Sequence, residues 1–414
     1  MEGDSPVQQQ ATTIPRSHDP ITLLGLPTEI LRRMVFFVDK GDPLNASILC
    51  KPKAPQHRAP PHRLSLKAEH RHYCHDGLDY KDAPLKSLTL TCRFLRKLVL
   101  PFLFEHISIS PNDFIRFLTF LRSKCLDSKV LGLHVYLTTQ YNHVQPPWWS
   151  HMLNALPTVR KITVTGRPEI LNGLVGMHSW MNDAWAFDMP LQILQLRRSV
   201  RSTHHQIDYE TNPDFLTSEN WTSMTVNEGS SLLAYTTYEF FSRRTPSLMT
   251  ALCYNCSVAA GTLFANLTHF DFIAIFPFSS HTEEVLHCIR RMKRLERLFL
   301  KLCPDPETTI FRDEVEAAGG HMDINDPWNE FEMSWELIAH TVLFLTMEGE
   351  LQELEMADMQ IEPLQHALKE KMTGSLRQWW SYSGNASGIW RRRKTRLIIE
   401  PETPSDTVPG FLND

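Results

Sequence analysis

The sequence predicts an α/β protein in which an N-terminal helical module precedes an irregular solenoid of parallel strands alternating with helices. Three observations support this prediction. The chain has 414 residues, which exceeds the size at which one hydrophobic core keeps growing. Apolar residues recur at helical spacing near the N-terminus and again after residue 85. Beyond residue 110, short strand-like apolar segments alternate with helix-like segments.

The first helix is expected to begin near Pro27, because a proline, the hydroxyl of Thr28 and the carboxylate of Glu29 all favour a first turn. Apolar residues then follow at intervals of three and four. They are Ile30, Leu31, Met34, Val35 and Val38. This spacing predicts one apolar stripe, which needs a surface to cover it.

A second helical pattern runs over residues 85–98 and is expected to stop at Pro101. Its apolar side includes Leu88, Leu95 and Leu98. Apolar residues at nearly alternating positions follow, as an entering strand would have them: Phe104, Ile107 and Ile109.

The segment between the two patterns, residues 40–84, is rich in Pro, His, Arg and Lys and predicts a long mobile loop. We therefore expect a disordered tail over residues 1–20 and a helical module over 21–109 that contains this loop. A solenoid is expected over 110–400, followed by a C-terminal tail over 401–414.

Six strands are expected in the solenoid, over residues 130–137, 159–165, 191–196, 267–273, 295–302 and 351–356. Several share a Leu-x-x-Leu-x-Leu cadence, at a spacing near 30 residues that is typical of leucine-rich repeats. Helical patterns lie between them, over 114–122, 148–156, 283–292 and 335–345. A strand followed by a helix, repeated, predicts a parallel sheet on the concave side of a curved solenoid. Large insertions are expected over 304–336 and 197–230.

The net charge and the distribution of apolar residues argue against two classes of partner, nucleic acids and membranes. A net charge of -5 provides no overall field for attracting nucleic acid or an anionic membrane. The first twenty residues lack the pattern of a signal peptide, and no stretch is apolar enough to span a bilayer. We therefore expect a cytoplasmic or nuclear protein, with eight mostly reduced cysteines and neither a nucleic acid nor a membrane as partner.

The helical module resembles an F-box, and the chain resembles fungal F-box proteins with a leucine-rich-repeat-like C-terminal region. The resemblance rests on three segments in order: Leu26-Pro27-Thr28-Glu29-Ile30-Leu31, then Leu88, Leu90, Cys92, Leu95, Leu98 and Val99, then the tail from Leu100 to Ile107. An F-box normally runs without interruption, whereas residues 40–84 are inserted here.

The resemblance implies a substrate-recognition adaptor of a Skp/cullin/F-box ubiquitin ligase, which is not itself an enzyme. The helical module would dock a Skp-family adaptor and through it a cullin, while the solenoid would bind a protein substrate of unknown identity. The residues implied in adaptor binding are Leu26, Pro27, Glu29, Ile30, Leu31, Met34, Val35, Leu88, Leu95 and Leu98. Three alternatives remain open. One is an ordinary buried helical hairpin with no external partner, and another is a ligase-independent repeat scaffold whose N-terminus the hairpin caps. The third is an enzyme, which would require a deep pocket with convergent polar groups on the solenoid.

Other clusters of residues give weaker indications of a function. The inserted loop holds five histidines and Cys74 without paired zinc-ligand spacing, and Cys253-Tyr254-Asn255-Cys256 has no second pair. The basic run over 390–396 could bind an acidic peptide, RNA or an import receptor, or could protect the edge of a final strand. We find no nucleophile elbow, phosphate-binding glycine loop or paired metal motif, and expect no cofactor, no metal and no catalytic residue.

Overall fold

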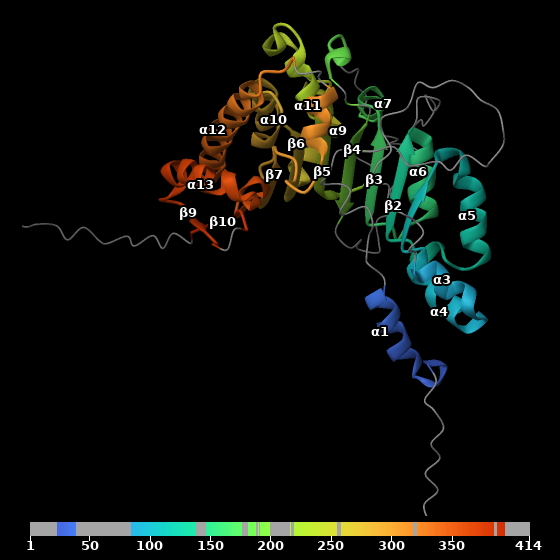
Figure 1. Cartoon of the computed structure of the whole chain (residues 1–414). Coiled ribbons are helices and arrows are strands. Elements are labelled where there is room, and N and C mark those ends of the chain that lie inside the picture. The colour runs from blue at the N-terminus through green and yellow to red at the C-terminus, as the bar shows by residue number, and fades with distance from the viewer. Residues whose placement is uncertain are drawn as a thin grey trace, which may run out of the picture. The chain divides into compact units, whose positions relative to one another are not determined.

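The computed structural model describes residues 23–38, 84–137, 146–175, 181–187, 189, 191–198, 216, 219–254, 258–317, 321–384 and 387–393. Contacts divide these residues into two compact units (Figure 1). The described residues up to Leu103 form the helical unit, and those from Phe104 onward form the sheet unit. The tails expected over 1–20 and 401–414, and nearly all of the inserted loop, lie outside the described residues.

The helical unit contains α1 (Thr28–Val38), α3 (Pro84–Thr91) and α4 (Arg93–Leu103), preceded by a 3₁₀ turn η1 (Leu23–Gly25). α4 continues through Pro101 for two residues beyond the stop that the sequence indicated. The three helices share a small core of six buried residues: Leu31, Val35, Leu85, Leu95, Leu98 and Val99. The Nε atom of Arg96 donates a hydrogen bond to the carbonyl oxygen of Thr89 at 2.9 Å, which ties α4 to α3.

The sheet unit contains one ten-stranded sheet in a mixed α/β fold. Its strands are β1 (His106–Ile109), β2 (Gly132–Leu137), β3 (Lys161–Gly166), β4 (Gln192–Arg198), β5 (Trp221–Ser230), β6 (His269–Ile275), β7 (Arg297–Lys301), β8 (Glu353–Met356), β9 (Trp380–Tyr382) and β10 (Ile389–Arg392). They follow one another in chain order through β8, and then come β10 and β9. All six strands expected from the sequence are confirmed, with starts shifted by one or two residues.

Helices connect most of these strands. They are α5 (Phe114–Ser123), α6 (Pro146–Ala155), α7 (Pro168–Leu174), α8 (Leu248–Tyr254), α9 (Val258–Asn266), α10 (Ser279–Arg290), α11 (Ile310–Ala317), α12 (Asn325–Glu348) and α13 (Glu362–Leu376), with short 3₁₀ turns including η8 (Ala357–Gln360). The four helices expected from the sequence correspond to α5, α6, α10 and α12. In the part of the chain that the structure describes, no helix combines the length and apolar character needed to cross a membrane.

The expectation of an entirely parallel sheet is wrong at two places. β4 runs antiparallel to both β3 and β5, and β10 runs antiparallel to both β8 and β9. A parallel pair requires a connection that carries the chain back along the strand. β4 begins at Gln192, which lies opposite Gly166 at the end of β3, so the chain enters β4 at the end where it left β3.

Two further expectations are corrected. Residues 197–230 are not an insertion throughout, because β5 (Trp221–Ser230) is a full member of the sheet between β4 and β6. The start of the basic run, Trp390–Arg392, lies in β10, which is paired on both sides and is therefore not an edge strand. The strand expected after residue 396 lies outside the described residues.

The two faces of the sheet differ in chemistry. One face carries apolar residues in register across the strands, such as Val226, Phe272 and Leu300. α10 packs on this face, because the ring of its His281 lies 6.2 Å from that of Phe272. The opposite face carries polar and charged residues at the alternate positions.

Candidate partner-binding surfaces

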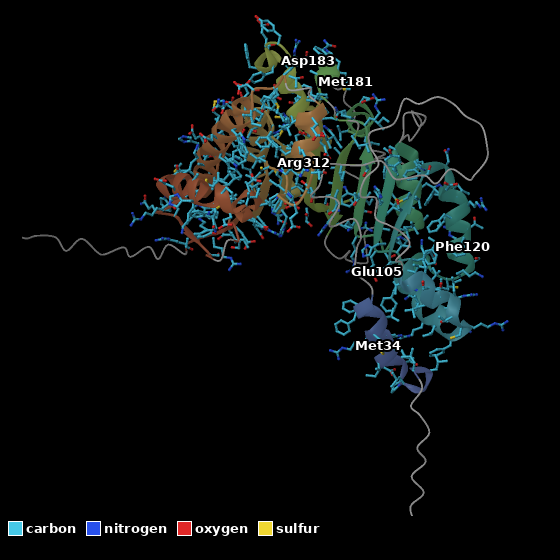
Figure 2. All side chains as sticks on the ribbon, viewed as in Figure 1. Met34, Glu105, Phe120, Met181, Asp183 and Arg312 are labelled. Atoms are coloured by element: carbon cyan, nitrogen blue, oxygen red, sulfur yellow. The ribbon has the colours of Figure 1, made fainter. Side chains whose placement is uncertain are left out.

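The helical unit exposes an unusual amount of apolar surface for its size. Eight large apolar side chains are exposed: Leu23, Leu24, Ile30, Met34, Phe36, Phe37, Leu90 and Phe94. Phe37 is 72% exposed and Leu90 is 77% exposed. Figure 2 shows the Met34 side chain among those that project from α1. Such a concentration of exposed apolar side chains is the property expected of an interaction surface.

Helical geometry explains how α1 serves both a core and a surface. Residues four apart lie on one line along a helix, and the next residue is turned by about 100°. Leu31 and Val35 form the line that enters the core of the helical unit, where they are 3% and 4% exposed. Ile30 and Met34 form the neighbouring line, which the core does not cover. The apolar stripe is therefore wider than the surface that α3 and α4 bury.

The ten residues that the sequence implied for adaptor binding divide into three groups. Leu31, Val35, Leu95 and Leu98 lie in the core of the helical unit. Leu26 and Leu88 are half-buried and pack against that core. Pro27, Glu29, Ile30 and Met34 are exposed. The exposed side chains are the ones available to a partner, while the buried ones hold α1 against α3 and α4.

The exposed apolar surface includes residues that sequence reasoning did not select. They are Leu23, Leu24, Phe36, Phe37, Leu90 and Phe94. The rings of Phe36 and Phe37 lie 5.9 Å apart, edge to face.

The helical unit is also strongly basic. Its described residues include only one acidic residue, Glu29, against six basic ones: Arg32, Arg33, Lys86, Arg93, Arg96 and Lys97. Because the complete chain has a net charge of -5, acidic residues elsewhere in the chain outweigh the excess of positive charge in this unit. Positive charge around an apolar surface favours a partner whose surface is acidic.

The second candidate surface is the polar face of the sheet, where two adjacent rows carry most of the charge. The first row is Arg197, Ser223, His269, Arg297, Glu353 and Arg391, and the second is Gln195, Thr225, Asp271, Phe299, Glu355 and Ile389. The side chain of Arg391 is 63% exposed and that of Arg297 is 41% exposed. This face can therefore contact another molecule at these positions.

Charged side chains on this face hold one another in place. Arg297 donates from Nη2 to Oε2 of Glu355 at 2.7 Å, and its Nε lies 3.3 Å from Oε1 of Glu353. Arg391 donates from Nε to Oε2 of Glu353 at 3.2 Å. Burial raises the pKa of Asp271, although the hydrogen bond from the Thr225 hydroxyl acts in the opposite direction. The result is a preorganised ladder of alternating charge that suits a polar peptide.

Nearer β1, the row that continues from Gln195 through Thr163 and His134 to Ser108 is polar but uncharged. His134 interacts with the Ser108 hydroxyl at 3.1 Å and with the Thr165 hydroxyl at 2.9 Å. Burial lowers the pKa of His134 to about 4, so its imidazole is neutral at physiological pH. Gln195 donates from Nε2 to the Thr163 hydroxyl at 3.0 Å. These contacts satisfy buried polar groups across neighbouring strands.

No metal site emerges in the part of the chain that is described, since no three histidine, cysteine or acidic side chains gather there. The His-rich segment with Cys74 lies outside the described residues, as does Cys256. The expectation that Cys253 is a buried thiol is only partly met, because Cys253 is half-buried.

Comparison with known proteins gives no match: no protein-family model, no curated protein and no solved structure resembles the chain closely enough to be assigned. Functional inference therefore depends on the chemistry of the two surfaces.

Proposed function

We propose that the chain is the substrate-recognition subunit of a Skp/cullin/F-box ubiquitin ligase and has no catalytic role of its own. The helical unit docks a Skp-family adaptor, and through it a cullin. The observation that carries this proposal is the set of eight large apolar side chains exposed on a helical unit whose own core contains only six buried residues.

The exposed apolar side chains of α1 provide a substantial part of the energy that docking needs. Full burial of a large apolar side chain contributes about 1.5–3 kcal/mol. Ile30, Met34, Phe36 and Phe37 all project from one short helix, so together they contribute on the order of 6–12 kcal/mol before the costs of association are subtracted. Insertion of one apolar helix face into a groove is a common mode of protein recognition.

The positive charge on α1 indicates which kind of adaptor surface would fit it. Arg32 and Arg33 lie on α1 among the exposed apolar residues, and only Glu29 opposes them within the described helical unit. We expect an apolar groove with an acidic rim on the adaptor, because opposite charges at the rim accelerate association and orient the partner.

The sheet unit supplies the substrate side. Strands that follow one another in chain order, with helices packed on one face, favour an irregular leucine-rich-repeat-like solenoid, although β4 departs from a regular repeat. The charged ladder around Arg297, Glu353 and Arg391 is the surface that we assign to the protein substrate. A ligase subunit of this kind acts in the cytoplasm, the nucleus or both.

A second candidate is a repeat scaffold that works without a ligase. The observation that favours it is the closed core of the helical unit, since Leu31, Val35, Leu95 and Leu98 are buried without any partner. A scaffold of this class would not bind a Skp-family adaptor, so adaptor binding distinguishes the two.

Binding to a purified Skp-family adaptor tests the proposal. In the full chain, the double substitution Ile30→Asp and Met34→Asp places charge on the exposed side of α1 and leaves the core residues unchanged. We expect the affinity to fall by about tenfold to a hundredfold, because buried apolar anchors dominate such interfaces. Isothermal titration calorimetry measures the change.

A matched control uses the same two residue types on the sheet unit. Ile115 on α5 is 58% exposed and Met347 on α12 is 65% exposed. The double variant Ile115→Asp, Met347→Asp should bind the adaptor as the unaltered chain does. Unchanged binding by the α1 variant, or equal loss in both variants, would reject the helical unit as the docking surface.

A further inference from the structure

Two thiols from different helices meet beside a fixed cation in the sheet unit. Cys253 lies in the last turn of α8 and is half-buried, while Cys288 lies in α10 and is buried. The Cys288 thiol donates a hydrogen bond to the carbonyl oxygen of Met249 at 3.4 Å, one turn before Cys253 in α8. The Cys288 side chain also interacts with the sulfur of Cys253. The two sulfurs are thus neighbours across a helix–helix contact.

Arg291 holds its positive charge next to Cys253. Its guanidinium donates from Nη1 to the carbonyl oxygen of Cys253 at 2.8 Å and also hydrogen-bonds the sulfur. The same guanidinium lies 4.9 Å from the centroid of the Phe264 ring, which fixes its position. A neutral thiol and a guanidinium therefore both lie beside the sulfur of Cys253.

These groups favour the thiolate of Cys253. The neighbouring Cys288 thiol and the charge of Arg291 lower the pKa of Cys253 to about 7, against the opposing effects of burial and of Glu284. Burial and the neighbouring Cys253 raise the pKa of Cys288, which stays a thiol while Cys253 is a thiolate. Oxidation of Cys253 removes the second of these two causes. A thiolate that is partly exposed and lies beside an arginine is typical of reactive cysteines.

Another described cysteine shows the opposite environment. Cys303 is buried, and burial together with the carboxylate of Asp358 raises its pKa. It provides an internal reference for an unreactive thiol.

We propose that Cys253 is a peroxide-reactive thiol and that Cys288 resolves its oxidised form into an interhelical disulfide. The thiolate of Cys253 attacks one oxygen of hydrogen peroxide, forms a sulfur–oxygen bond and releases hydroxide, which leaves a sulfenic acid. The sulfur of Cys288 then attacks the sulfur of Cys253, loses its proton and displaces hydroxide, which leaves as water. The sulfurs lose two electrons in total, and peroxide is reduced to two waters. The inference does not depend on the ligase proposal.

Oxidation of the full chain with a small excess of hydrogen peroxide, followed by alkylation and peptide mass spectrometry, tests this inference. We expect one peptide pair joined through Cys253 and Cys288, with a mass about 2 Da below the sum of the two reduced peptides. The variant Cys288→Ser should instead accumulate a sulfenic acid at Cys253 that a dimedone-type probe traps. Cys303 should remain reduced throughout.

The contradicting results are equally specific. A disulfide between Cys253 and Cys256, or oxidation of Cys303 as fast as that of Cys253, would overturn the assignment. The variant Cys256→Ser removes the competing thiol and should still form the Cys253–Cys288 disulfide.

The role of Arg291 is tested by alkylation rates at pH 7. Arg291→Gln removes the charge beside Cys253 and should slow alkylation of that thiol roughly fivefold to tenfold, whereas Arg291→Lys should retain most of the rate. Circular dichroism checks that both variants fold. Equal rates in the glutamine variant and the unaltered chain would remove Arg291 from the explanation.

Discussion

Glu228→Ala should lower the free energy of unfolding of the sheet unit by about 3–5 kcal/mol, because it removes one partner of a buried ion pair. The carboxylate of Glu228 accepts three hydrogen bonds: from His281 Nε2 at 2.6 Å, the Ser247 hydroxyl at 2.7 Å and the Met249 amide at 2.9 Å. Glu228 thereby joins β5 to α10 and to the first turn of α8. Urea unfolding followed by circular dichroism measures the loss.

A matched variant separates charge from hydrogen bonding. Glu228→Gln keeps the shape and an acceptor oxygen but removes the negative charge, so it should cost less than the alanine substitution. If Glu228→Ala unfolds within about 0.5 kcal/mol of the unaltered chain, as a surface substitution would, then the buried network does not stabilise the fold.

The same pair gives the sheet unit a pH dependence. Burial lowers the pKa of His281, but the charge and hydrogen bond of Glu228 together with the charge of Glu284 outweigh it, so the net shift is upward from the ordinary value of 6.5. The folded state then keeps a proton that the unfolded state has already released. The stabilising contribution is complete below about pH 6.5 and is lost as the pH rises through the folded-state pKa. His281→Gln should remove this part of the pH dependence.

Asp358→Ala should lower the free energy of unfolding by about 2–4 kcal/mol, because it leaves two buried backbone amides without acceptors. Asp358 lies in η8 and is fully buried. Its carboxyl oxygens accept hydrogen bonds from the amides of Leu302 and Cys303 at 3.0–3.2 Å. These bonds end β7 and hold the next connection against it.

Asp358→Asn is the informative control, because its carbonyl oxygen can still accept from both amides. Burial raises the pKa of Asp358 to about 7, against the opposing effect of the two amides. The folded state therefore binds a proton between about pH 4 and pH 7 that the unfolded state has released, and stability falls as the pH rises through that range. We expect this fall to be absent in the asparagine variant. A stability equal to that of the unaltered chain in Asp358→Ala would contradict the structural role.

The sequence predicted strands well where burial is apolar. β6 and β7 carry buried apolar residues at alternate positions, such as Phe270, Phe272, Leu298 and Leu300, so a local pattern suffices to find them. β5 escaped detection because Thr225, Asn227, Glu228 and Ser230 are polar and yet buried. Hydrogen bonds to residues distant in the sequence offset the cost of burying these polar groups: Thr225 bonds to Asp271, and Glu228 bonds to His281. Such compensation cannot be read from a window of neighbouring residues.

The docking surface was predictable only in outline. Helical spacing identified the apolar stripe of α1 but not which half of it enters the core. That division depends on how α3 and α4 pack, which buries Leu31 and Val35 and leaves Ile30 and Met34 exposed. Phe36 and Phe37 were passed over because the stripe was followed at intervals of three and four.

Hydrogen–deuterium exchange of the full chain, with and without a purified Skp-family adaptor, tests the docking proposal most directly. We expect the adaptor to slow exchange in peptides from residues 23–38 and 84–103, because helices whose exposed side becomes buried open less often. Peptides from β6 and β7 should exchange at the same rate in both states. Unchanged exchange in the helical unit at saturating adaptor, or protection confined to the sheet unit, would contradict the proposed docking surface.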